Sequence, residues 1–126
     1  MNISIGPELS IGDLRIGTPR IQARALLGTA VTFRRTPDAP ETDHFAADGL
    51  LLTYEGDRVT FIEVVAPASP TILGVELLGV PLPHALGELA RVGVVGHLDA
   101  DGAFLPEWHV GLYSPEGVVE GVSIGE

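Results

Sequence analysis

The sequence predicts an α+β fold in which two tandem helix-plus-antiparallel-hairpin repeats pack as a single domain over residues 1–126. Residues 15–28 have a weaker copy that begins at Leu77 and runs to Gly93. Each copy is followed by a pair of apolar, alternating segments around a tyrosine, Tyr54 or Tyr113. The length suits one domain with a core of its own. We expect repeat 1 to cover about residues 9–66 and repeat 2 about residues 71–126.

In the first copy, Thr18 and Pro19 predict the start of a helix. A threonine hydroxyl can cap a helix, and a proline at the first helical position loses no hydrogen bond. Gly28 is typical of a helix end. An apolar stripe at helical spacing is formed by Ala23, Leu26 and Leu27.

In the second copy, Pro81 has the same role and Gly93 marks the end of the helix. Gly87 lies within the segment and weakens it by about 1 kcal/mol relative to alanine. The apolar residues at helical spacing are Leu82, Ala85, Leu86 and Leu89.

Alternating apolar residues predict a hairpin over residues 50–65, with its turn at residues 55–57. A second hairpin is expected over residues 109–124, with its turn at residues 114–117. A short strand is expected at residues 31–35. Proline and polar residues predict loops at residues 36–42 and 66–71.

Within the second hairpin, Val118, Val122 and Ile124 are expected on one face. Gly121 and Ser123 leave the opposite face thin, which is typical of close contact with another layer or a partner. Homodimerisation through this thin face is one alternative for the function.

The composition excludes several classes of protein. The 45% apolar content indicates a folded chain, and no apolar run approaches the ~18 residues of a membrane span. The first eight residues lack the pattern of a secretory signal. The absence of cysteine removes disulfides, thiolate metal sites and a lipid-anchor thiol. We therefore expect a cytoplasmic protein without membrane contact, and we predict no cofactor.

The charge is acidic and uneven. Residues 1–66 carry nine acids and six arginines, whereas residues 67–126 carry eight acids and one arginine, for a net charge of −10. A field of this sign repels phosphate backbones, so nucleic acid is not expected as a partner. It favours a basic protein partner. The alternative is that the acidic surface serves solubility alone.

Residues 16–28, Ile-Gly-Thr-Pro-Arg-Ile-Gln-Ala-Arg-Ala-Leu-Leu-Gly, carry a glycine-led cap, a short helix and a closing apolar pair with glycine. This stretch resembles the helix signature of two families, the SmpA/OmlA-type outer-membrane assembly lipoproteins and the tandem-repeat β-lactamase inhibitor proteins. The inhibitor proteins have two such units. The resemblance implies an α+β fold and binding of another protein through a sheet face and loops.

The densest group of acids and histidines lies between His97 and His109. It could hold a metal ion, but its spacing does not complete a calcium loop, so a polar turn between strands is the preferred interpretation and no metal site is predicted. Trp108 is either an interface anchor or a core residue. The residues predicted to bind a partner are Asp99, Asp101, Glu107, Trp108 and His109.

No catalytic residue is predicted. Asp43 and His44 are sequence neighbours, and in a strand the side chains of neighbours point to opposite faces, so the two cannot act as a pair. No Gly-x-Ser-x-Gly nucleophile motif occurs. The arginines of the first copy could bind a carboxylate or phosphate ligand; they are Arg15, Arg20, Arg24, Arg34 and Arg35. The preferred alternative is that the adjacent strand arginines, Arg34 and Arg35, pair with the nearby acids Asp38, Glu41 and Asp43.

These observations favour a non-enzymatic protein-interaction module, of the inhibitor or immunity type, that uses an acidic surface to bind a basic partner. The alternative is a small-molecule-binding domain or small enzyme with a pocket between the repeats, near His97 and His109.

Overall fold

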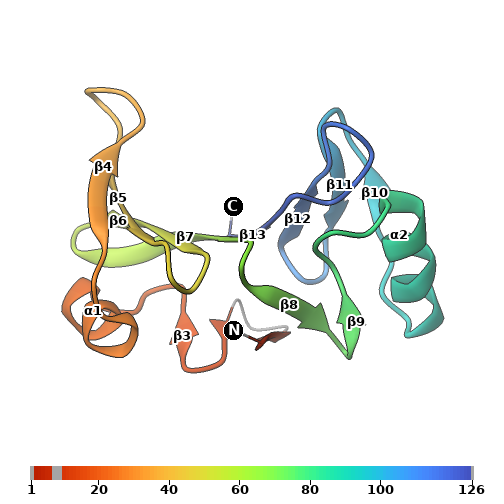
Figure 1. Cartoon of the computed structure of the whole chain (residues 1–126), viewed down its shortest axis with the longest axis horizontal. Coiled ribbons are helices and arrows are strands. Elements are labelled where there is room, and N and C mark those ends of the chain that lie inside the picture. Colours follow the sequence, from red (N-terminus) through yellow and green to blue (C-terminus); the bar gives the residue numbers. More distant parts are fainter. Residues whose placement is uncertain (1, 7–9, 126) are drawn as a thin grey trace.

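The computed structural model describes residues 2–6 and 10–125, and two sheets dominate it (Figure 1). The larger sheet has eight strands. In spatial order they are β10 (His97–Leu98), β11 (Gly102–Leu105), β12 (Val110–Tyr113), β13 (Gly121–Ile124), β7 (Arg58–Val65), β6 (Leu50–Glu55), β5 (Glu41–Phe45) and β4 (Val31–Arg34).

The smaller sheet has five strands. In spatial order they are β3 (Leu14–Arg15), β2 (Ser10–Ile11), β1 (Asn2–Gly6), β8 (Ser69–Ile72) and β9 (Val75–Glu76). Strand β1 runs parallel to β8, with Ile3 opposite Pro70. The beginning of the chain is thereby held against the segment that connects its two halves.

The predicted fold class is wrong. Strands account for 45% of the residues and helices for 15%, so the fold is mainly β. Strands β7 and β13 pair from Val65–Gly121 to Ile62–Ile124, and this pairing joins the two predicted hairpins into one sheet. The smaller sheet combines residues from before the first helix with residues from the predicted loop at 66–71. The two predicted helix-plus-hairpin repeats are therefore not two units packed together.

Both predicted helices are present, but their ends differ from the prediction. Helix α1 (Arg20–Leu27) has Pro19 as its N-cap, one residue later than expected. The Thr18 hydroxyl instead accepts a hydrogen bond from the Arg15 N–H at 3.1 Å, so it fixes the turn before the helix. Helix α2 (Leu82–Arg91) follows Pro81 and ends before Val92, short of the predicted Gly93.

The two helices begin with similar backbone contacts, α1 to strand β7 and α2 to the segment that precedes β13. Gly17 N–H donates to the Val59 carbonyl at 2.7 Å, and Gly79 N–H donates to the Val119 carbonyl at 2.9 Å. Pro19 and Pro81 each form an isolated bridge to the strand segment beside them. A proline at this position has no N–H to leave unpaired, which suits the start of both helices.

The predicted hairpin over residues 50–65 is confirmed as β6 and β7. The second hairpin has β12 and β13 as predicted, but Val118 lies outside them, exposed and bridged to Pro81. The two predicted loops are too long. Strand β5 begins at Glu41 and strand β8 begins at Ser69.

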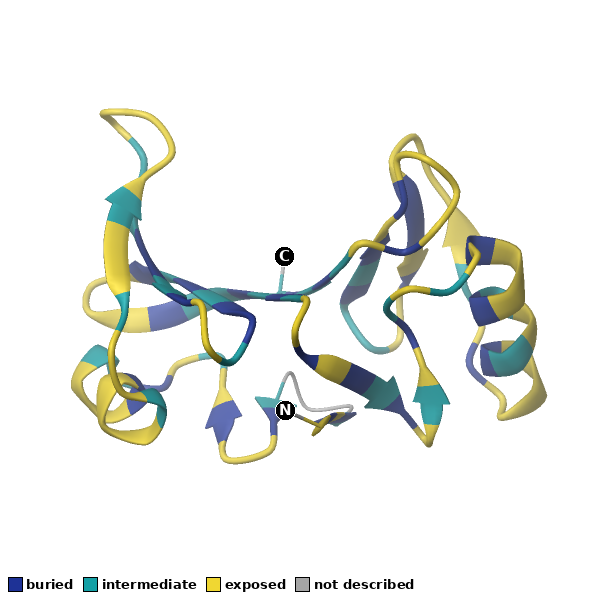
Figure 2. Ribbon diagram, in the orientation of Figure 1, coloured by how far each residue is buried: buried dark blue, intermediate teal, exposed yellow. Residues whose placement is uncertain are grey.

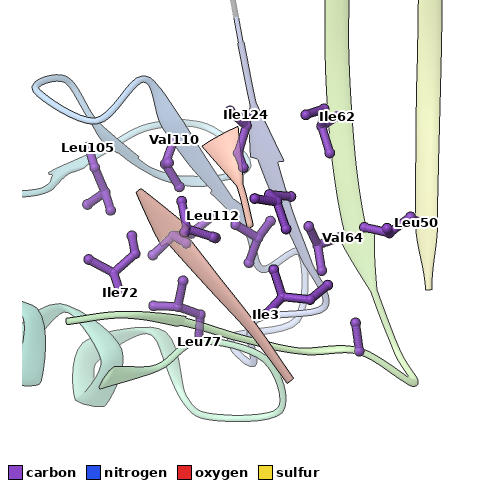
Figure 3. Packing of buried hydrophobic residues seen from close by; sticks show 14 of the residues in the cluster. Ile3, Leu50, Ile62, Val64, Ile72, Leu77, Leu105, Val110, Leu112 and Ile124 are labelled. Atoms are coloured by element: carbon purple, nitrogen blue, oxygen red, sulfur yellow. The ribbon is translucent and has the colours of Figure 1, made fainter. Parts of the chain in front are cut away.

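The core lies between the two sheets and beneath the helices. Figure 3 shows side chains from both halves of the chain around β1, with Ile3 between the large sheet and residues Ile72 and Leu77. Ile72, Leu77 and Ile62 are completely buried. Burial of each such side chain contributes about 1.5–3 kcal/mol, so this shared interior stabilises both halves together.

Both helices and the smaller sheet lie on one side of the large sheet (Figure 1). The strands rise at both ends, β4 and β5 on one side and β10 to β12 on the other, so the uncovered side is concave. We call this uncovered side the open face. Figure 2 shows that much of the upper part of both rising ends of the sheet is exposed.

Neither of the described helices is long and apolar enough to cross a membrane. The expected cytoplasmic location stays a prediction. The outer bounds predicted for the repeats, residues 9 and 126, lie outside the described residues, as do Met1, Pro7 and Glu8 of the segment used for the targeting prediction.

Replacing Gly49 by alanine is expected to lower the free energy of unfolding by about 2–4 kcal/mol. Gly49 has φ 72°, and a Cβ there would lie 2.2 Å from the Val65 carbonyl oxygen, which is backbone and cannot move aside cheaply. Gly87→Ala is the matched control, because its Cβ meets open space and it removes a glycine from a helix. Urea unfolding should show that the free energy of unfolding of the control rises by about 1 kcal/mol. Equal stability of the two variants would contradict the prediction.

Candidate functional site

The residues predicted to bind a partner fall into two places. Asp99 and Asp101 lie in the turn between β10 and β11, where the Asp99 carboxylate accepts a hydrogen bond from the Asp101 N–H at 3.0 Å. Both side chains are exposed. The interpretation of this segment as a polar turn between strands is confirmed.

Glu107, Trp108 and His109 lie in the turn at the other end of β11. The four residues of that strand span about 10 Å, so the structure does not bring them together with the two aspartates. Trp108 is half-buried and packs against the core, and His109 is half-buried with φ 52°. Partner binding by these five residues stays a prediction.

Five surface hollows formed by described residues have volumes of about 110 to 430 Å³. Their linings contain neither His97 nor His109. The hollows lie on the open face and around the start of α1, and the predicted pocket near these histidines is not among them.

A buried carboxylate connects α1 to the large sheet. Asp43 on β5 has no exposed side-chain surface. Arg24 on α1 donates to it twice, from Nε to Oδ2 at 2.8 Å and from a terminal nitrogen to Oδ1 at 3.0 Å. Thr32 donates to Oδ1 at 2.6 Å and Tyr54 donates to Oδ2 at 2.9 Å. Arg20 also donates to Oδ1, at 3.4 Å, so five hydrogen bonds from four side chains surround this one carboxylate.

Arg20 completes this cluster from the first turn of α1. Its guanidinium lies 4.6 Å from the centre of the Tyr54 ring and 3.4 Å from Asp43 Oδ1. It also donates to Glu41 at 3.1 Å. Glu41 and Asp43 are thus paired with arginines of α1.

Burial by itself raises the pKa of Asp43, but the hydrogen bonds from Arg24, Thr32 and Tyr54 outweigh it and hold this pKa well below its ordinary value. Burial, and then the hydrogen bond to the Asp43 carboxylate, raise the pKa of Tyr54. Asp43 is thus ionised and fully engaged by groups of the protein. We conclude that this cluster anchors the helix.

The predicted pairing of Arg34 and Arg35 with Asp38, Glu41 and Asp43 is wrong. Arg34 donates to the Ala39 carbonyl at 2.6 Å. Arg35 forms an ion pair with Glu63, which lies on β7 and therefore two strands beyond β5. The Arg35 side chain thus extends across part of the open face.

The open face is a continuous row of side chains that crosses all eight strands. The sheet register fixes this row, because each member lies opposite the next on the neighbouring strand. From one edge to the other the row is Val31, His44, Leu51, Glu63, Ser123, Gly111, Phe104 and His97.

Two hollows lie next to each other on this face and share Glu63 in their linings. The larger, of about 430 Å³, includes Phe61 and Arg35. The smaller, of about 110 Å³, lies over Gly121 and is bordered by Tyr113. Glycine and serine in the middle of the sheet therefore leave a depression between aromatic side chains.

Most of the residues of the open face could not be predicted from the sequence. The thin face at Gly121 and Ser123 was predicted, and both residues lie on the open face. The pairing of β7 with β13 has no signal in either hairpin alone, so the neighbours Glu63 and Val65 could not be placed beside them. Thr53 and Phe61 alternate with buried residues along β6 and β7, and this alternation was the only sequence feature that indicated an exposed face here.

Replacing Asp43 by asparagine is expected to cost about 3 kcal/mol at neutral pH, because Arg24 and Tyr54 lose the carboxylate that they bind. Since folding lowers the pKa of Asp43, its contribution is complete above about pH 3.9, the ordinary value in an unfolded chain, and is lost as the pH falls further. The difference in stability between Asp43→Asn and the original chain should therefore narrow below about pH 4.

The matched control is Asp57→Asn, which removes the same charge from a side chain that is 87% exposed. Urea unfolding between pH 7 and pH 3 measures both variants. A difference for Asp43→Asn that stays constant over this range would contradict the predicted linkage.

Comparison with known proteins assigns no family to this chain. No protein-family model, no curated protein and no solved structure matches it. The function is therefore inferred from the residues and contacts of the chain itself.

Proposed function

We propose that this protein is a non-enzymatic protein-binding module that receives a basic partner on the open face of its large sheet. The observation that carries the proposal is a concave sheet face that no element of the described chain covers, while the opposite face is covered by helices and strands (Figure 1). The role of an inhibitor or immunity-type protein belongs to this proposal.

The side chains of the open face suit a protein interface. Tyr113 is 52% exposed, Phe104 is 38% exposed and Val31 is 68% exposed. Exposed apolar residues that are scattered singly need no explanation, but these belong to one continuous face together with half-buried Leu51 and Phe61. Aromatic residues are enriched among the residues that dominate binding energies.

The depression over Gly121 provides a place for an inserted side chain. A Cβ at Gly121 would meet its nearest neighbours, Tyr113 and Val65, at 3.8 Å, which is ordinary contact. The space above the glycine is therefore open, and the fold does not require glycine there. An apolar side chain of a partner can occupy this depression beside the Tyr113 ring.

The charge distribution favours a basic partner. Arginines of the first half are engaged within the chain, among them Arg20, Arg24 and Arg35. In the second half, within residues 67–125, the one ion pair is between Arg91 and Glu88. Exposed acids of that half include Glu76, Asp99, Asp101, Glu107, Glu116 and Glu120.

Self-association is disfavoured on the same ground. A second copy would bring a net charge of −10 against an equal charge, which repels at moderate ionic strength. A basic protein gains both a faster encounter and complementary contacts. Sedimentation of the purified chain as a monomer supports this choice, and a stable dimer formed through the open face contradicts it.

Replacing Gly121 by valine is expected to weaken partner binding by about tenfold, because the new side chain fills the depression that receives the partner. Stability should change little, since valine suits a strand and its Cβ meets its nearest neighbours at an ordinary contact distance. Gly87→Ala is the control, because it adds a side chain on α2, away from the open face.

The measurement compares proteins retained from a lysate of the source organism by the original chain and by both variants, at low and high salt. The proposal expects a basic protein whose retention is salt-sensitive, is lost with Gly121→Val and is kept with Gly87→Ala. Equal retention by all three chains would show that the open face does not bind it.

A further inference from the structure

Arg35 lines the larger hollow of the open face, and its side chain crosses two strands to reach a carboxylate. It follows β4 at the sheet edge, extends past β5 and β6, and pairs with Glu63 on β7. Its guanidinium carbon lies 5.9 Å from the centre of the Phe33 ring. The Arg35 side chain is still 52% exposed, so this ion pair lies at the surface and contributes little to stability.

The same hollow has the chemistry that binds a guanidinium group. Two carboxylates line it, Glu63 and the exposed Glu55, and within the described residues no ion pair engages Glu55. Phe61 contributes an aromatic side chain to the same lining. Carboxylates and an aromatic ring together are the partners that a planar guanidinium prefers.

Hydroxyl groups extend this lining. Thr42 and Thr53 lie 3.1 Å apart through their hydroxyl oxygens, and the Thr60 hydroxyl donates to the Thr53 carbonyl at 3.3 Å. The volume of about 430 Å³ exceeds what a single arginine side chain fills. The hollow therefore has room for a second side chain.

We propose that this hollow is a subsite for an arginine side chain of the basic partner, and that Arg35 is a resident competitor that holds Glu63 until the partner arrives. This inference rests on the proposed function of the open face. The arriving guanidinium takes Glu63 and Glu55 as acceptors and lies against Phe61, and Arg35 is released into solvent. Because the neighbouring depression over Gly121 shares Glu63, the partner presents an apolar side chain close to its arginine.

The probe for this proposal is N-acetyl-L-arginine amide, added to the full-length chain labelled with ¹⁵N. Amide shifts of Thr53, Phe61 and Glu63 follow its binding. Arg35→Gln is expected to bind the probe about threefold more tightly than the original chain, because the competitor is gone. Arg34→Gln is the matched control, since it removes the same charge from the neighbouring residue, whose guanidinium donates to the Ala39 carbonyl.

Two further comparisons test the carboxylate. Adding Glu63→Gln to Arg35→Gln should abolish the gain, and N-acetyl-L-citrulline amide, which has the same shape without the charge, should not bind. The proposal is overturned when Arg35→Gln binds no more tightly than Arg34→Gln, or when citrulline amide binds as well as arginine amide. Thermal melting of each variant verifies that it is folded.

The outcome is separable from that of the proposed function. Loss of the basic partner with Gly121→Val, combined with no saturable arginine binding, leaves the open face as the binding surface and removes the arginine subsite. Saturable arginine binding, combined with unchanged partner retention by Gly121→Val, supports the subsite and removes the apolar insertion beside it.

Discussion

The pairing of β7 with β13 is the constraint on which the rest of the structure depends. It spans four residue pairs, from Val65–Gly121 to Ile62–Ile124, and no other strand pairing connects the two halves of the large sheet. The members of this pairing alternate between the core and the open face. Ile62 and Ile124 are completely buried, whereas Gly121 and Ser123 border the depression on the other side. The same four pairs therefore hold the core together and form the centre of the proposed binding surface.

The two ends of the large sheet hold their helices by different interactions. Asp43, which lies two residues before the buried Phe45, binds α1 through Arg24 and Arg20. At the other end, Ala103 lies two residues before the buried Leu105, and the buried apolar side chains of α2 belong to the shared core. Helix α1 buries only Ala23 completely, while α2 buries Leu82, Ala85 and Leu89.

This difference also explains the surface charge. Arginines of the first half form ion pairs with Asp43 and Glu63, so they do not neutralise acids elsewhere on the surface. Exposed acids of the second half, among them Glu76, Asp99 and Asp101, lie at the surface. The uneven charge of the sequence thus corresponds to a physical difference between the two ends of the molecule.

Local patterns predicted the local elements well. Pro19 and Pro81 located both helix starts to within a residue, and the alternation around Tyr54 located β6 and β7. The error at Thr18 arose because its hydroxyl binds the preceding turn, which competes with capping of the helix.

What joins the elements could not be predicted from the same patterns. Strand β8 contains Pro70 within a proline-rich segment that is typical of a loop, yet it pairs with β1, some 68 residues distant in sequence. The prediction of the fold class was wrong for this reason. Pairings between segments that are distant in sequence join the two expected repeats into shared sheets. The Arg35–Glu63 contact joins residues 28 positions apart in the sequence and was missed for the same reason, whereas the thin face at Gly121 was visible locally.

The contrast between the two helix attachments makes the two ends of the molecule sensitive to different properties of the solvent. Apolar burial weakens on cooling, and the cost of removing charges from water falls on warming. A chilled solution therefore loosens the contacts of α2 more than those of α1, and a warm one favours the charged attachment. The concave sheet therefore lies between a helix attached mainly through charged side chains and a helix attached through apolar burial, and these two attachments respond in opposite directions to temperature.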